Sequence, residues 1–96
     1  MITYVSTIKF TDKGIAHLKD TCRRAENFEK HANKVGVKIL EIFWTQGPFD
    51  GLILFEAPDD LTATGLMAHL CTGGFVHTQT TRAYRADEMK TILEKL

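Results

Sequence analysis

Two apolar stretches, residues 37–45 and 49–57, constrain the fold more than any other feature of the sequence. Both are rich in β-branched and aromatic residues, and a short turn separates them, which predicts the two strands of a hairpin. Successive side chains of a strand point to opposite faces, yet Ile53 and Leu54 make both faces of the second strand apolar. A sheet built on this hairpin therefore needs cover on both faces.

The turn between these strands reads TQGPFDG, residues 45–51. Gly47 permits backbone conformations that other residues avoid, and Pro48 fixes φ and removes an N–H donor. Asp50 can accept hydrogen bonds from neighbouring backbone amides. We therefore interpret the segment as a tight turn and not as a reaction site.

Hydrophobic periodicity predicts the order of the elements, because apolar residues alternate in strands and recur every three or four positions in helices. The predicted elements are strand 2–10, helix 14–35, strands 37–45 and 49–57, helix 59–72, strand 75–84 and helix 86–96. Asp20 and Thr21 can cap a helix start, which allows the first helix to consist of a short and a long segment. The β-α-β-β-α-β order with a terminal helix is the ferredoxin-like arrangement of a four-stranded antiparallel sheet. We expect one α+β domain over residues 1–96.

The ferredoxin-like arrangement places both crossover helices on one face of the sheet and leaves the other face uncovered. Each large apolar side chain left in water forgoes roughly 1.5–3 kcal/mol, so we expect a second copy to cover this face in a two-fold dimer. The apolar candidates for the dimer face are Leu40, Ile42, Trp44, Leu52 and Leu54. The alternative is that the terminal helix 86–96 folds over this face within one chain.

Three charged side chains, Lys9, Glu56 and Arg82, are expected on the same face as the dimer candidates. Their predicted neighbours on that face are Thr3, Thr7, Thr78 and Thr80. Interfaces commonly include polar rims and trapped water, so we interpret this mixed lining as part of a wet subunit interface. A second, charged pocket between the sheets is the alternative.

Several segments together resemble the GYD domain family. They are KFTDKG at the end of the first strand, FWTQG before the turn, FEAPDD after the third strand and TTRAYRADEM near the C-terminus. The Gly-x-Tyr-Asp element of the family matches Gly47, Phe49 and Asp50, and Phe49 leaves this position without a phenolic hydroxyl. Cys22 stands where a helix-starting Pro is expected. The resemblance implies a ferredoxin-like fold of the dimeric α/β-barrel group and a largely uncharacterised function.

A polar cluster is expected on the helix-facing side of the sheet, where the first and last strands are neighbours. Tyr4 and Ser6 of the first strand are predicted to share this side with His77 and Gln79 of the last strand. Convergent polar groups among apolar side chains are typical of a small-molecule pocket, and His77 is the candidate base because histidine titrates near neutrality. The alternative is that the four side chains satisfy one another at a partly wet sheet edge.

Cys22 lies beside two arginines near a helix start, which favours a reactive thiolate. The same position continues the apolar stripe of the first helix, which favours a buried structural thiol.

His69 and Cys71 are two positions apart on a helix and point away from each other, so we expect no metal site from them and His77. The sequence has no Gly-rich phosphate loop, and we expect no cofactor.

Charge and composition bear on the partners of the chain. Twelve Lys and Arg balance twelve Asp and Glu with the signs interspersed, so we expect no nucleic acid or membrane partner. Two cysteines in helical segments and the lack of an N-terminal leader indicate the cytoplasm.

We expect a homodimer or higher homo-oligomer that binds a small, mostly apolar molecule between its helices and its sheet. The alternatives are a cofactor-free oxygenase, isomerase or decarboxylase with His77 as base, and a purely structural assembly module.

Overall fold

A four-stranded antiparallel sheet organises the chain in the computed structural model, which describes residues 1–96. The elements are β1 (Ile2–Phe10), α1 (Asp12–Ala16), the 3-10 helix η1 (Leu18–Asp20), α2 (Thr21–Lys34), β2 (Lys38–Trp44), β3 (Gly51–Ala57), α3 (Asp60–Thr72), β4 (Val76–Arg82) and α4 (Ala86–Leu93). The strand order is β2-β3-β1-β4. The predicted ferredoxin-like α+β fold is confirmed, and the sheet of the single chain is open.

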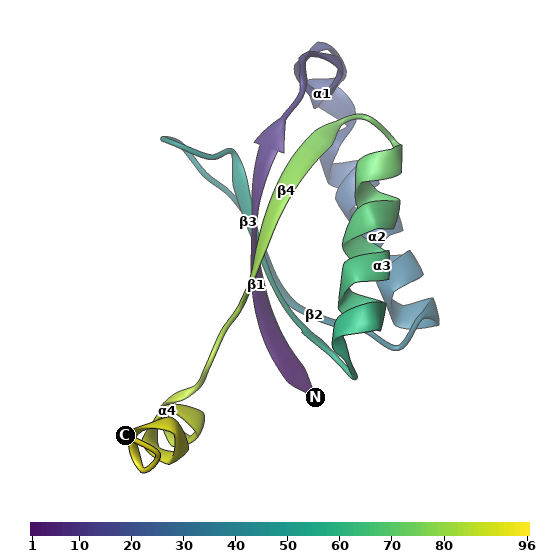
Figure 1. Ribbon diagram of the computed structural model, residues 1–96. Helices are drawn as coiled ribbons and strands as arrows, with labels where there is room; N and C mark the ends of the chain where they lie inside the picture. Colours follow the sequence, from purple (N-terminus) through teal and green to yellow (C-terminus); the bar gives the residue numbers. More distant parts are fainter.

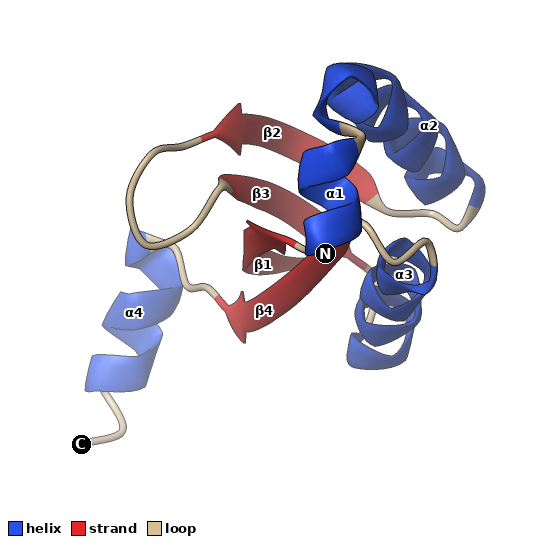
Figure 2. Ribbon diagram, turned by 90° about the horizontal axis from the view of Figure 1, so that it is seen from above, coloured by secondary structure: helices blue, strands red, loops and turns tan.

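Helices α2 and α3 pack on one face of the sheet, as Figures 1 and 2 show. The apolar stripes of these helices meet every second residue of β1 and β3, and together they form the core. The buried apolar residues are Tyr4, Ile8, Phe28, Ala32, Val37, Ile53, Phe55, Ala57, Ala63, Leu66 and Met67. None of the helices has the length and apolar character that crossing a membrane requires.

The first predicted helix is divided after Asp20, where η1 ends and α2 begins at Thr21. Thr11 caps α1, because its Oγ1 accepts a hydrogen bond from the Gly14 N–H at 3.0 Å. A Cβ on Gly14 would lie 2.1 Å from the carbonyl oxygen of Phe75. Glycine at this position therefore allows α1 to approach the start of β4, and it holds Phe75 beside the helical layer.

A β-bulge interrupts β2 at Leu40, between Ile39 and Glu41. A bulge inserts one extra residue into a strand, and the alternation of faces is reversed beyond it. Ile39 faces the helices before the bulge. Ile42 and Trp44 face the helices after it, because their partners on β3 belong to the helix-facing side.

The bulge corrects part of the predicted dimer face. The placement of Ile42 and Trp44 on the face without helices, called the free face below, is wrong, because a strict two-residue alternation does not pass through Leu40. Phe43 lies on the free face instead, opposite Leu52. Phe43 is 52% exposed, so the free face keeps an apolar character after the correction.

Strand β4 pairs with β1 in a regular antiparallel register. Ser6 is opposite Thr80, and the Thr80 hydroxyl donates to Ser6 Oγ at 3.0 Å on the helix-facing side. His77 is opposite Lys9, and both lie on the free face. The side chains of the even-numbered residues of β4 therefore face the helices, and those of the odd-numbered residues lie on the free face.

Helix α4 extends away from the rest of the chain (Figure 1), on the side of the sheet opposite α2 and α3 (Figure 2). Glu88 fixes its start, since its carboxylate accepts from the Arg85 N–H and pairs with Arg82, both at 3.0 Å. These hydrogen bonds lower the pKa of Glu88. The exposed apolar side chains of this region are Tyr84, Met89, Leu93 and Leu96. The alternative in which this helix covers the free face of its own chain is wrong, because α4 lies beyond the end of the sheet.

Candidate functional site

Tyr4 and Ser6 are buried on the helix-facing side of β1, and structural contacts occupy their polar groups. The Tyr4 hydroxyl donates to Asp60, and its ring stacks on Phe55 with the centroids 5.3 Å apart. The hydrogen bond to the Asp60 carboxylate, together with burial and the negative charge of that carboxylate, raises the pKa of Tyr4 to about 12. Ser6 accepts from Thr80. Neither side chain lines the cavity described below.

The expected cluster of four polar side chains does not form. His77 and Gln79 lie on the free face, across the sheet from Tyr4 and Ser6. The prediction is wrong by one residue in the alternation of β4, because this edge strand consists mostly of polar residues and offers little hydrophobic contrast to fix its faces. Val76, which packs against the core, is the residue that indicates the observed face.

The charged side chains expected on the free face lie in two places. Lys9 and Glu56 are on that face. Arg82 belongs to the helix-facing register of β4, pairs with Glu88 at 3.0 Å and lies over the ring of Tyr84 at 4.4 Å. The placement of Arg82 on the free face is therefore wrong, since the alternation of β4 is reversed, and Arg82 connects the sheet to α4.

Hydrogen bonds of its own residues fix the turn between β2 and β3 and connect it to β1. Gly47 has a φ of 117°, which other residues rarely adopt. Asp50 Oδ2 accepts from the Phe10 N–H at 2.9 Å, and the Asp50 carbonyl accepts from the Thr45 N–H at 2.9 Å. The carbonyl of the half-buried Phe49 accepts from Thr45 Oγ1 at 2.8 Å. These contacts hold the turn against β1, which agrees with a structural role.

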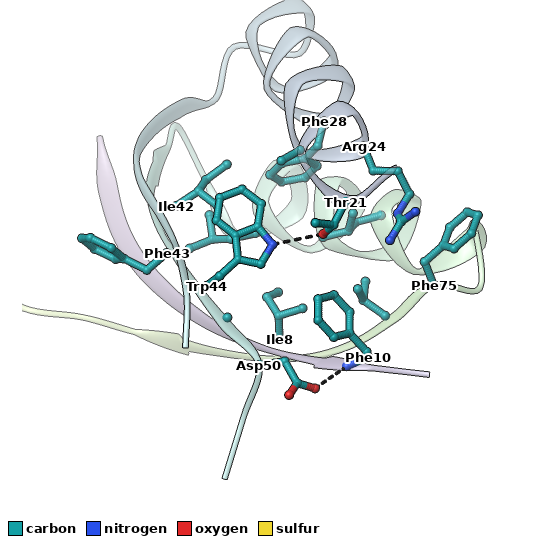
Figure 3. A pocket seen from close by; sticks show the side chains of 15 residues that line it. Ile8, Phe10, Thr21, Arg24, Phe28, Ile42, Phe43, Trp44, Asp50 and Phe75 are labelled. Carbon is teal, nitrogen blue, oxygen red and sulfur yellow. Dashed lines mark hydrogen bonds between the residues drawn. The ribbon is translucent and has the colours of Figure 1, made fainter. Parts of the chain in front are cut away.

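An apolar cavity of about 90 Å³ lies between α2 and the sheet (Figure 3). Eleven of its fifteen lining residues are hydrophobic. A mostly apolar wall with a few polar groups is typical of a small-molecule site. A buried water needs roughly 10–15 Å³, so this cavity has room for a compact group of several heavy atoms. The apolar wall includes Ile8, Ala25, Phe28, Ile42, Ile53 and Leu70.

The polar groups of the cavity come mainly from the first turns of α2. Trp44 at the end of β2 donates its indole N–H to Thr21 Oγ1 at 3.0 Å. Arg24 Nη1 donates to the carbonyl of His17 at 2.8 Å, and the guanidinium lies 4.3 Å from the ring centroid of Phe75. Arg24 Nη2 is buried and has no hydrogen-bond partner in the protein. Thr21 and Arg24 are three residues apart, so they face the same side of the helix.

The sequence predicts a pocket between the helices and the sheet, but it does not predict the polar residues of this cavity. The sequence does not show that Trp44 faces α2, because strict alternation from Ile39 would place Trp44 on the free face. Phe75 and Arg24 are far apart in the sequence, so no local pattern indicates their contact. The one signal in the sequence is the spacing of Thr21, Arg24 and Phe28, which places the three side chains on one face of a helix.

Cys22 is exposed on α2, and Cys71 on α3 is half-buried with its Sγ 3.5 Å from Thr78 Oγ1. The interpretation of Cys22 as a buried structural thiol is wrong, because the inner face of α2 passes through its neighbours Thr21 and Ala25. The two cysteines are not bridged. No three His, Cys, Asp or Glu side chains are grouped to hold a metal ion.

The fold and the cavity define a small ferredoxin-like α+β domain with space for a ligand between its helices and its sheet. The chain belongs to the GYD domain family, whose sequence profile matches residues 4–93. A solved structure with a similar fold is the feast or famine regulatory protein from M. tuberculosis, complexed with L-methionine, with a TM-score of 0.68 and 15% identity. The similarity covers 90% of this chain and 52% of that one, so the chain spans about half the length of the regulatory protein. Comparison with curated protein sequences gives no match.

Proposed function

We propose that the chain is a homodimeric module that binds a small, mostly apolar molecule between α2 and the sheet. The cavity is the observation that carries this proposal. The cavity opens partly to solvent, so a ligand can enter it, and its volume of about 90 Å³ holds a compact group of several heavy atoms. Its wall is apolar at Ile8, Phe28 and Ile42 and polar at Thr21 and Arg24, which suits a ligand with one polar end.

The feast or famine regulatory protein supports the ligand-binding part of the proposal. That protein is complexed with L-methionine, a small molecule with an apolar side chain. Its fold is similar to that of this chain, so a domain of this shape is compatible with a small-molecule role. The identity of 15% transfers no particular ligand to this chain.

The free face of the sheet supports the homodimer. Val5, Phe43, Leu52 and Leu54 lie on this face, on three adjacent strands that no helix of the same chain covers. Burying apolar surface contributes roughly 25 cal/mol per Å², and a two-fold axis lets the same patch of two copies cover each other. Helix α4 projects on this side of the sheet (Figure 2), where its exposed apolar side chains would meet the partner.

The two alternative functions have less support. His77, the candidate base of an enzyme, lies on the free face opposite Lys9, so the sheet separates it from the cavity. A general base must reach the proton that it removes, and a molecule in the cavity is out of reach of His77. A purely structural module would not need a cavity.

A ligand screen with a cavity-filled variant tests the proposal. Ala25→Leu places three more carbon atoms against the cavity, and Ala68→Leu on the exposed side of α3 is the matched control. A ligand at a hundredfold excess over its Kd stabilises a protein by about 2.7 kcal/mol. Small apolar molecules that raise the Tm should act on the wild type and Ala68→Leu and lose their effect on Ala25→Leu.

Mass spectrometry of the protein after extraction should identify any molecule that co-purifies with the wild type and is depleted in Ala25→Leu. Equal stabilisation of all three proteins would place binding outside the cavity. The proposal would be contradicted if no molecule of a broad library stabilises the protein and no molecule co-purifies with it.

A further inference from the structure

The guanidinium of Arg24 has an unused hydrogen-bonding edge at the cavity. Nη1 donates to the carbonyl of His17 at 2.8 Å, and Cζ lies 4.3 Å from the ring centroid of Phe75. Nη2 is buried and donates to no protein atom. Buried donors are nearly always paired, and an unpaired one is destabilising. The position of Arg24 is therefore held by His17 and Phe75, which leaves Nη2 for another acceptor.

The positive charge of Arg24 has no carboxylate partner within the protein. Asp50 also lines the cavity, but its Oδ2 accepts from the Phe10 N–H at 2.9 Å and lies 3.8 Å from Lys9 Nζ. Figure 3 shows Asp50 turned toward Phe10, while Arg24 comes from the helix on the other side of the cavity. Asp20, which directly precedes α2, pairs with Arg23 at 2.9 Å. An arginine that lacks an ion pair at an apolar cavity favours an anionic ligand.

A second donor lies next to Arg24 on the same face of α2. Thr21 Oγ1 accepts the indole hydrogen of Trp44 at 3.0 Å, so the hydroxyl hydrogen of Thr21 remains free to be donated. Thr21 and Arg24 both line the cavity and are one helical turn apart. Two donors on one face of a helix can each serve one oxygen of a carboxylate.

We propose that the ligand of the cavity is a small apolar monocarboxylate. Its carboxylate accepts hydrogen bonds from Arg24 Nη2 and Thr21 Oγ1, and its short aliphatic or aromatic tail lies among Ile8, Phe28 and Ile42. A neutral amide of the same shape leaves the charge of Arg24 uncompensated, and an amine adds a second positive charge beside it. This inference rests on the proposed function, since it names the class of ligand for the same cavity.

Three probes with one tail and different head groups test the charge preference. Isovalerate, isovaleramide and isopentylamine are titrated by calorimetry at neutral pH, and benzoate, benzamide and benzylamine repeat the series with an aromatic tail. Hydrogen bonds to a charged group lead us to expect roughly ten- to hundredfold tighter binding of the carboxylate than of the amide. We expect the amine to bind more weakly than the amide.

Three arginine variants test whether the preference for a carboxylate depends on Arg24. Arg24→Gln removes the charge and should reduce carboxylate affinity by roughly ten- to hundredfold while it leaves amide affinity unchanged. Arg23→Gln is the matched control, because Arg23 is the exposed neighbour that pairs with Asp20 at 2.9 Å and does not line the cavity. Arg24→Lys keeps the charge without the planar fork. It should recover part of the carboxylate affinity, which also separates lost binding from lost folding.

The outcomes distinguish this inference from the proposed function. Amide and carboxylate affinities that are equal, or a carboxylate affinity that Arg24→Gln does not reduce, would overturn the carboxylate assignment and leave a ligand-binding cavity in place. Failure of both carboxylates to bind would also overturn it. The ligand screen and the co-purifying molecule then decide separately whether the cavity binds anything.

Discussion

Trp44 donates its indole N–H to Thr21 Oγ1 across 3.0 Å and so connects the end of β2 to the first turn of α2. This contact exists because the extra residue Leu40 turns Trp44 toward the helices. Without the bulge, a strand that begins with Ile39 facing the core would place Trp44 on the free face. The bulge therefore decides which side chains of β2 line the cavity.

Deleting residues of β2 one at a time tests the role of the bulge. Deleting Leu40 leaves Ile39, Ile42 and Trp44 on the helix-facing side of a regular strand, because Leu40 is the extra residue. We expect this variant to fold and to keep the fluorescence maximum of Trp44. Deleting Phe43 instead moves Trp44 to the free face, and its emission should shift. Equal spectra for the two deletions would contradict the assignment of the bulge.

The limits of the sequence-based prediction are visible in these same strands. The alternation in β1 is clear, and the helices follow from their stripes and caps, so the fold class is predictable. In β2 both faces of the alternating pattern are apolar, so the pattern cannot reveal an extra residue. In β4 the mostly polar sequence gives no preference strong enough to distinguish His77 from Thr78 as the inward residue. The expected place of the pocket, between the helices and the sheet, agrees with the cavity, while the extra residue in β2 prevented the prediction that Trp44 lines it.

We expect the chain to form a dimer through the apolar free face of the sheet. Leu54→Lys places a charge among the apolar side chains of this face, and unpaired buried charges are strongly destabilising. Sedimentation equilibrium at micromolar concentration should give about 21.6 kDa for the wild type, twice the 10.8 kDa of one chain, and 10.8 kDa for the variant. Leu61→Lys is the control, because Leu61 is 87% exposed on α3. A wild-type mass of one chain, or a variant mass of two, would rule out this face as the interface.

The hydrogen bond between Tyr4 and Asp60 predicts a loss of stability at high pH. The pKa of Tyr4 is raised from 10.0 to about 12, so the folded state holds the phenolic proton more tightly than the unfolded state does. This contribution is complete below pH 10, and it is lost as the pH rises to about 12. Urea unfolding of Tyr4→Phe should lack this part of the pH dependence. Tyr84→Phe, at an exposed tyrosine, should retain it; identical profiles for the two variants would refute the prediction.

Two glycine substitutions test the approach of α1 to β4. A Cβ at Gly14 would overlap the carbonyl oxygen of Phe75, so Gly14→Ala should destabilise the protein by about 1–3 kcal/mol or more. Gly65 lies inside α3 with no atom within 4 Å of a Cβ. Gly65→Ala should therefore stabilise the protein by about 0.4–1 kcal/mol. The urea midpoints should move in opposite directions, and a shift in the same direction would show that α1 is not fixed as described.

The emission of Trp44, the only tryptophan of the chain, tests most directly whether the cavity binds small molecules. Trp44 lines the cavity, so its fluorescence reports on what enters. Titration of the wild type with a stabilising molecule from the screen should give a saturable change, and the same titration of Ala25→Leu should give none. A change of equal size in both proteins, or a flat response in the wild type, would contradict ligand binding in the cavity.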